Sequence, residues 1–168
     1  MPTIQSLKKK LQVILSTQKI TQAMKTAATV KYSKLSELYS DFSKYEEQCS
    51  DMYDTYRDEI NSVFLPKNPD APILYVVLCS NKGMCGNFDM ELFSFFENIL
   101  CEQKSCPVIF CCGKKGIEYF NNKKIPYNEA FVFDDIPSYS VASELFEKIM
   151  QLIKNGDVSD VKIVYPEY

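Results

Sequence analysis

Residues 3–64 decide the fold of this chain, and they read TIQSLKKKLQVILSTQKITQAMKTAATVKYSKLSELYSDFSKYEEQCSDMYDTYRDEINSVF. The stretch contains neither proline nor glycine, and Pro2 and Pro66 flank it. Because both helix breakers are absent, we predict one continuous helix, about 90 Å long, over Thr3–Phe64. The rest of the chain would form a domain with a radius of gyration near ~13 Å. Most of the helix must therefore find its partner outside the core of this chain.

Apolar residues recur along this helix with the spacing of a coiled coil. The first run advances in steps of three and four residues, as a coiled-coil seam does, and consists of Ile4, Leu7, Leu11 and Ile14. We expect this seam to self-associate or to pair with a separate helix. A second run with the same spacing comprises Leu35, Leu38, Phe42, Tyr45, Cys49, Met52 and Tyr56, and Ile60 and Val63 extend it one step out of register. The second run fits either another seam or a helix face packed on the body of the protein.

Charge is sorted along the same helix. Seven lysines and no acidic residue occur up to Ser36, whereas eight acidic residues accompany Lys44 and Arg57 between Glu37 and Phe64. A basic helix can bind nucleic acid, a membrane surface or an acidic protein. No aromatic residue is interleaved with the lysines before Tyr32, and no wide apolar face backs them. An acidic protein surface is therefore the favoured partner, and nucleic acid is not.

Composition narrows the class of protein further. The chain has 168 residues, a net charge of −3 and 46% hydrophobic residues, which is ordinary for a folded domain. No apolar run approaches the ~20 residues that span a bilayer, and we recognise no secretory leader, so we expect a cytoplasmic protein. Seven cysteines without a CxxC pair, and no histidine, predict free, buried thiols and no metal site.

Beyond residue 72, apolar β-branched runs alternate with helical periods. The predicted strands are Ile73–Cys79, Val108–Cys112, Ala130–Phe133 and Val161–Tyr165, and the predicted helices are Met90–Gln103, Lys114–Asn122 and Ser138–Asn155. In the last helix we expect inward side chains at Leu145, Phe146, Ile149, Leu152 and Ile153. The alternation predicts an α/β, Rossmann-like domain with a largely parallel four-stranded sheet. We place the shaft helix in residues 1–65 and the Rossmann-like domain in residues 66–168.

The loop after the first predicted strand, Ser80–Asp89, is where doubly wound folds hold phosphates. Its sequence SNKGMCGNFD has GxxG rather than GxGxxG, and the chain lacks GxxxxGK[ST]. Without histidine, and without a carboxylate pair in this loop, the sequence offers no general acid and base. We therefore predict no catalytic residue, no cofactor and no bound metal.

Two stretches resemble one protein family. Ser16–Ala28, STQKITQAMKTAA, resembles the N-terminal helix motif of the gamma subunit of F-type ATP synthase, and Ser80–Asp89 resembles that family's loop after its first strand. Weaker matches follow in the same order along the chain, at Leu7–Leu11, Gly113–Phe120 and Asp160–Tyr165. Together they extend over the whole chain.

This resemblance implies a non-catalytic central-stalk, or rotor, subunit of a proton-translocating F-type ATP synthase. In the family, the N- and C-terminal helices form an antiparallel coiled coil that turns inside a ring of alpha and beta subunits. The α/β domain lies beside epsilon and the c-ring, and torque passes between the c-ring and the catalytic ring. The implied location is cytoplasmic, peripheral to the inner face of the cell membrane, with no direct transmembrane insertion.

The resemblance also assigns residues to subunit contacts. Those that it places on the shaft are Thr17, Gln18, Lys19, Ile20, Thr21, Ala23, Met24 and Lys25. Those that it places on the loop are Ser80, Gly83, Cys85, Gly86 and Phe88. The chain departs from the family pattern in that loop, where Asn81, Lys82 and Asn87 replace Asp, Arg and Gly.

The largest departure is length, because the family continues beyond the position of Tyr168 with its C-terminal helix. We expect a truncated gamma-type subunit that receives the missing helix in trans or self-associates. One alternative is a stand-alone gamma-like binding module outside any rotary complex. Another is a small α/β nucleotide-binding protein with a helical arm.

Overall fold

The computed structural model describes residues 3–56, 68–103, 105–134 and 138–166. The chain divides into two compact units, residues 1–60 and 61–168, which are described separately below. The domain boundary expected between residues 65 and 66 lies outside the described residues and stays a prediction.

The first unit is one helix, α1, which spans Ile4–Tyr56 and has 53 residues. This confirms the long helix expected from the absence of glycine and proline, while its predicted continuation to Phe64 lies outside the described residues. Thr3 lies just before the helix, where its hydroxyl accepts a 3.3 Å hydrogen bond from the Ser6 amide. A side chain at this place satisfies one of the amides that a helix start leaves unpaired. None of the α1 residues is buried.

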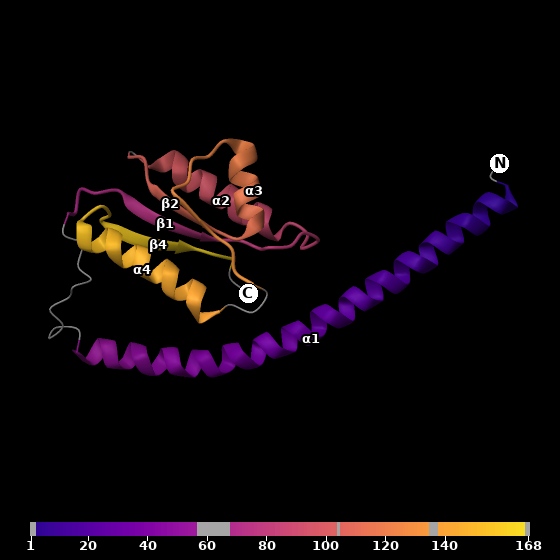
Figure 1. Ribbon diagram of the computed structural model, residues 1–168, viewed down its shortest axis with the longest axis horizontal. Coiled ribbons are helices and arrows are strands. Elements are labelled where there is room, and N and C mark those ends of the chain that lie inside the picture. Colours follow the sequence, from indigo (N-terminus) through magenta and orange to yellow (C-terminus); the bar gives the residue numbers. More distant parts are fainter. Residues whose placement is uncertain (1–2, 57–67, 104, 135–137, 167–168) are drawn as a thin grey trace. The chain divides into compact units, whose positions relative to one another are not determined.

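The second unit is a four-stranded parallel sheet with helices on both faces, which confirms the predicted α/β class. The sheet order is β3-β2-β1-β4, and the strands are β1 (Ile73–Leu78), β2 (Val108–Cys112), β3 (Glu129–Phe131) and β4 (Asp160–Val164). The helices are α2 (Phe88–Glu102), α3 (Lys114–Lys123) and α4 (Tyr139–Asn155). In Figure 1, α2 and α3 lie on one face of the sheet and α4 lies on the other.

β1 lies at the centre of this unit, where its side chains alternate between two apolar cores. Tyr75 and Val77 point into the core under α2 and α3, and Leu74 and Val76 point into the core under α4. Both pairs are buried, which confirms the prediction of a strand covered on both faces. The first core is aromatic: Phe96 packs on Tyr75 and on Phe120, with ring centroids 5.7 and 5.8 Å apart.

Some sequence predictions differ from the structure in detail. β1 ends at Leu78 rather than at Cys79, β3 is shorter and begins earlier than predicted, and α2 begins at Phe88 rather than at Met90. The inward position predicted for Phe146 is wrong, because this side chain is 56% exposed. Each helical residue turns by about 100°, so the residue after the packed Leu145 rotates toward solvent.

The cysteines also differ from expectation. All seven are free, and Cys111 and Cys112 are buried in β2 as predicted. The expectation of burial is wrong for four others, which are exposed: Cys49, Cys85, Cys101 and Cys106. Within the described residues, no group of three or more potential ligands could hold a metal ion, and no helix is long and apolar enough to cross a membrane.

Candidate functional site

The shaft residues lie in a part of α1 whose polar groups are satisfied by the helix itself. The hydroxyl of Thr17 donates to the carbonyl of Val13 at 2.9 Å, and that of Thr21 donates to the carbonyl of Thr17 at 2.8 Å. Thr26 and Thr29 repeat this pattern. A threonine that bonds to the carbonyl four residues earlier needs no partner elsewhere. This segment is therefore polar in sequence but requires few polar groups from whatever contacts it.

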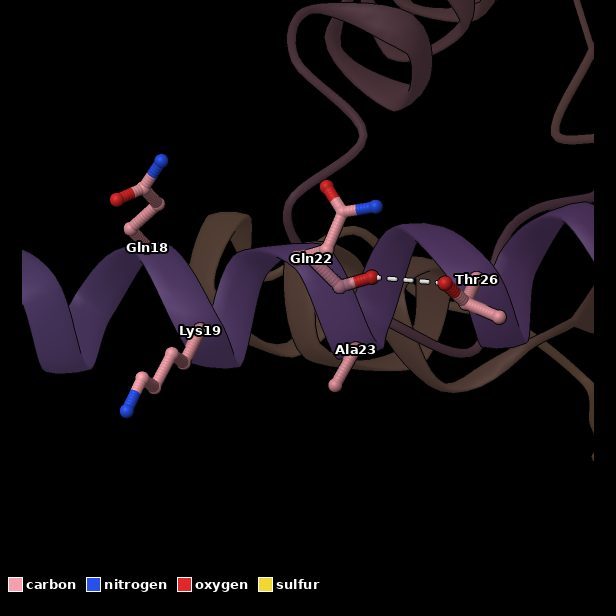
Figure 2. Close-up of a pocket in the computed structure, with 5 residues that line it drawn as sticks. All are labelled: Gln18, Lys19, Gln22, Ala23 and Thr26. Carbon is pink, nitrogen blue, oxygen red and sulfur yellow. Dashed lines mark hydrogen bonds between the residues drawn. The ribbon is translucent and has the colours of Figure 1, made fainter.

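Five residues of this segment line a shallow, open hollow, namely Gln18, Lys19, Gln22, Ala23 and Thr26. Figure 2 shows that Gln18 and Gln22 point to one side of α1, whereas Lys19 and Ala23 point to another. Sequence reasoning missed Gln22 and Thr26, although both lie one helical turn from a residue that it named. Eight shaft residues between Thr17 and Lys25 span more than two turns, so they lie on all sides of the helix rather than on one face.

In the second unit, the loop from Ser80 to Asn87 is organised by a carboxylate to which the sequence analysis gave no role. Asp89 is 7% exposed and accepts hydrogen bonds from the Ser80 amide at 3.0 Å and the Ser80 hydroxyl at 2.5 Å. The Cys85 thiol donates to the same carboxylate at 3.4 Å. Asp89 lies in the first turn of α2, where the helix dipole stabilises a negative charge. An acidic residue one position after the start of a helix was the signal that could have identified it.

Asn81 ties this loop to two other parts of the sheet edge. Its side-chain amide donates to the carbonyl of Phe133, beyond β3, and its side-chain oxygen accepts a 3.1 Å hydrogen bond from the Lys114 amide. The carbonyl of Ser80 accepts from the next amide, that of Lys115, at 3.0 Å. The first amides of α3 are thus occupied by the loop, and they are the groups that would otherwise bind an anion.

The two loop glycines have different requirements. Gly86 has φ of +65°, a left-handed conformation that favours glycine, and a β-carbon there would meet no atom within 4 Å. A β-carbon at Gly83 would lie 3.8 Å from Cε of Lys115, which is an ordinary contact. The structure therefore explains Gly86 by its backbone and places no such demand on Gly83. Phe88, the last of the predicted loop residues, is the first residue of α2 and is exposed.

Burial and neighbouring side chains shift the pKa values of several groups around the loop. The Glu118 carboxylate, 2.6 Å from Nζ of Lys115, raises the pKa of that lysine, and Asp89 adds to the effect. A hydrogen bond to Cys111, together with burial, raises the pKa of the Cys79 thiol, while the same hydrogen bond lowers the pKa of Cys111. Burial raises the pKa of Cys112 to about 12. Neutral buried thiols are poor nucleophiles. Of the predicted loop residues, Ser80 and Cys85 share a partner, because both donate hydrogen bonds to the Asp89 carboxylate.

These features define a class: a long exposed helix followed by a parallel α/β unit whose first loop is filled by its own side chains. The family described as ATP synthase matches residues 3–168. A protein of Clostridium beijerinckii, "ATP synthase gamma chain", is 32% identical in a 167-position alignment that covers 96% of this chain and 59% of that protein. The gamma chain of Mycoplasma mobile is 30% identical in a 176-position alignment that covers 100% of this chain and 60% of that protein.

The chain belongs to the ATP synthase gamma-chain family, which confirms the resemblance seen in the sequence. It spans about 60% of the length of the curated relatives that it matches. Among solved structures, a chain of the cryo-EM structure of the Euglena gracilis mitochondrial ATP synthase rotor matches 86% of this chain and 51% of that chain. That match has 17% sequence identity and a TM-score of 0.49.

Proposed function

We propose that this chain is a non-catalytic central-stalk subunit of a proton-translocating F-type ATP synthase. In this role it transmits torque between the c-ring and the catalytic ring of alpha and beta subunits, with epsilon as a further partner. It acts on the cytoplasmic side, peripheral to the inner face of the cell membrane. The observation that carries the proposal is α1, a 53-residue helix with no buried residue, in a chain of the gamma family.

The arrangement of the shaft residues supports this role. Thr17–Lys25 present side chains in every direction around α1, and Ile20 and Met24 are exposed apolar residues among them. A helix that is contacted on all sides suits the inside of a ring better than a flat docking surface. We therefore assign to the alpha and beta subunits the contacts of Thr17, Gln18, Lys19, Ile20, Thr21, Ala23, Met24 and Lys25.

The loop supports a second contact, made by the α/β unit. Gly83, Cys85, Gly86 and Phe88 are exposed, while Ser80 is held by Asp89 behind them. Because its polar groups are already paired, this loop is a preformed surface that would lose little conformational freedom on binding. We assign to these five residues a contact with a neighbouring subunit. The carboxylate of Asp89 within the loop disfavours a phosphate there, which argues against the nucleotide-binding alternative.

The proposal is tested by co-expression of a tagged chain with the alpha and beta subunits of a related ATP synthase. We expect both subunits to co-purify, and Ile20→Glu to reduce their recovery by about tenfold, since it places a charge in the shaft contact. Val30→Glu is the matched control, because Val30 is also an exposed apolar residue of α1 but lies outside the shaft residues. If neither subunit co-purifies, the stand-alone binding module replaces the rotor subunit as the better explanation.

The apolar seam at the start of α1 requires a partner whether the chain is a rotor subunit or a stand-alone module. Ile4, Leu7, Leu11 and Ile14 are all exposed in α1. Burying one such side chain is worth about 1.5–3 kcal/mol, so we propose that a second helix in trans, or another copy of this chain, covers them. Sedimentation of the wild type and of Leu7→Lys/Leu11→Lys tests self-association. Monomers in both samples, with the helix intact by circular dichroism, would refute it.

A further inference from the structure

One flank of α2 carries two exposed aromatic side chains. Phe88 is 45% exposed and Phe95 is 59% exposed, and the seven-residue spacing places them on the same side of the helix. Glu91 and Glu102 fall on this side as well, three residues after Phe88 and seven after Phe95. We refer to Phe88, Glu91, Phe95 and Glu102 as the free flank of α2.

The opposite flank of α2 is occupied by α3. Phe93 stacks on Tyr119 with ring centroids 4.1 Å apart, and Glu97 accepts a 2.7 Å hydrogen bond from the Tyr119 hydroxyl. Figure 1 shows α2 and α3 together on one face of the sheet, opposite α4. The free flank therefore points away from α3, and both of its phenylalanines stay exposed.

The charges of α2 are all of one sign. Its sequence FDMELFSFFENILCE contains Asp89, Glu91, Glu97 and Glu102 and no basic residue. Asp89 is held in the loop and Glu97 is paired with Lys123 at 3.3 Å. Glu91 accepts a 3.1 Å hydrogen bond from the neutral side-chain amide of Asn87, which leaves its charge, like that of Glu102, available to a cation. Glu102 ends the helix, where the dipole disfavours a negative charge, and no described residue forms an ion pair with it. A cation supplied from outside would relieve this repulsion.

We propose that the free flank of α2 is a docking surface for a basic amphipathic helix of another polypeptide. Its apolar residues, spaced by one heptad, would cover Phe88 and Phe95, and its lysine or arginine side chains would pair with Glu91 and Glu102. On the same sheet face, β4 places Lys162 in register with Tyr75 and the acidic Asp160 in register with Ile73, so β4 adds one charge of each sign beside α2. An anionic membrane is disfavoured by the same two glutamates. The proposal shares Phe88 with the loop contact proposed above, but it concerns the second unit alone and does not depend on α1 acting as a shaft.

Photo-crosslinking of the full chain tests this surface. p-Benzoylphenylalanine is placed at position 95, or as a control at the neighbouring exposed position of Ser94, which is turned by about 100° from Phe95. The probes are two synthetic amphipathic peptides of about 18 residues, five helical turns, one of leucine and lysine and the other of leucine and glutamate. We expect position 95 to capture the lysine peptide, and to capture it less in high salt.

A charge reversal separates the proposed contact from general stickiness. Glu91→Lys/Glu102→Lys should reduce capture of the lysine peptide at position 95 by about tenfold. The matched control, Glu144→Lys/Glu147→Lys, makes the same change in net charge on α4, which lies on the other face of the sheet, and should leave capture unchanged. Circular dichroism checks that both variants keep the fold.

The outcomes decide the proposal directly. Equal capture of both peptides, equal capture at positions 94 and 95, or capture that survives the charge reversal on α2 would each overturn it. Binding of phosphatidylserine vesicles that is lost with Phe95→Ser would also overturn it, since it would identify the flank as a lipid contact.

Discussion

Leu11 in α1 and Val77 in β1 are both aliphatic residues, but they have opposite surroundings. Leu11 is 55% exposed, as part of a helix in which no residue is buried, whereas Val77 is 0% exposed in a strand covered on both faces. The second unit therefore buries apolar residues of its own strands and helices, whereas α1 buries none of its residues. This difference shows that hydrophobic composition alone does not make a core, because an apolar stripe on one helix needs a second element to pack against.

The comparison predicts where the chain keeps its stability. Isolated helices gain little from their own hydrogen bonds, since most helical stability in proteins comes from packing. In α1 the stabilising contacts are local, such as the threonine hydroxyls and the pair between Asp41 and Lys44 at 3.6 Å. In the second unit they join residues far apart in sequence, as in the contact of Tyr75 with Phe96.

Truncating one residue of each region gives the largest expected difference. Phe96→Ala removes a ring that is 0% exposed between Tyr75 and Phe120, and should lower the free energy of unfolding by about 3–5 kcal/mol. Leu11→Ala should change the unfolding of the second unit by less than about 0.5 kcal/mol, because its side chain contributes nothing to that core. Urea denaturation followed by tyrosine fluorescence measures both. Similar losses for the two variants would refute the division between the regions.

Glycine substitutions test how tightly the second unit is packed at the end of β1. Gly113 has φ of +114°, and a β-carbon there would overlap the backbone carbonyl of Cys79, with the carbonyl carbon 2.8 Å away. Gly113→Ala should therefore cost about 3 kcal/mol or more. Gly83→Ala is the control and should change stability by less than about 1 kcal/mol, since its β-carbon makes only an ordinary contact. Equal urea midpoints for the two variants would contradict this account.

A smaller loss of stability is expected at Asn81, whose side chain bonds the loop to Phe133 and Lys114. Asn81→Asp keeps the acceptor for the Lys114 amide but replaces the donor to the Phe133 carbonyl with a negative oxygen. The loss should be about 1–3 kcal/mol, the usual cost of leaving a partly buried polar group unpaired. Lys82→Arg, one residue away and exposed, should have almost no effect on the urea midpoint. If both variants kept the wild-type urea midpoint, the contacts of Asn81 would not contribute to the stability of the second unit.

The parts of the fold that could be predicted from sequence are those that depend on neighbouring residues. The absence of breakers predicted α1, and the apolar run ILYVVL predicted a strand buried on both faces. Phe146 was misjudged because the helical period alone does not fix which residue at the border of the apolar face is covered. The exposed cysteines were misjudged for a related reason, since burial depends on elements that pack from elsewhere in the chain.

The candidate site was less predictable because its contacts are not local. Ser80 and Asp89 are nine residues apart, and Asn81 and Phe133 are 52 residues apart. A motif in the sequence located the loop, but it did not show that Asp89 holds it together or that Asn81 joins it to the chain after β3. Only the parallel order of β1, β2 and β3 brings these groups to one edge of the sheet.

Ion pairs provide the smallest and last test, because each region has one that can be removed. Glu97 on α2 accepts a hydrogen bond from the Tyr119 hydroxyl and lies 3.3 Å from Nζ of Lys123, and these contacts to α3 lower the pKa of its carboxyl. A lowered pKa in the folded state means that Glu97 stabilises the fold above its unfolded pKa of about 4.3, and that this stability is lost as the pH falls through the folded pKa.

Glu97→Gln should therefore lower the urea midpoint of the second unit near about pH 7 and change it little near about pH 3, where the wild-type carboxyl is protonated too. Asp41→Asn removes the pair with Lys44 inside α1, which joins no other element, and should leave that midpoint unchanged at both values. Exposed pairs are individually weak, so the pH dependence is more informative than the size of the effect. An equal gap between wild type and Glu97→Gln at both pH values would mean that the glutamate acts by packing rather than by charge. A shift with Asp41→Asn would mean that α1 and the second unit unfold together, which would remove the energetic independence on which the comparison rests.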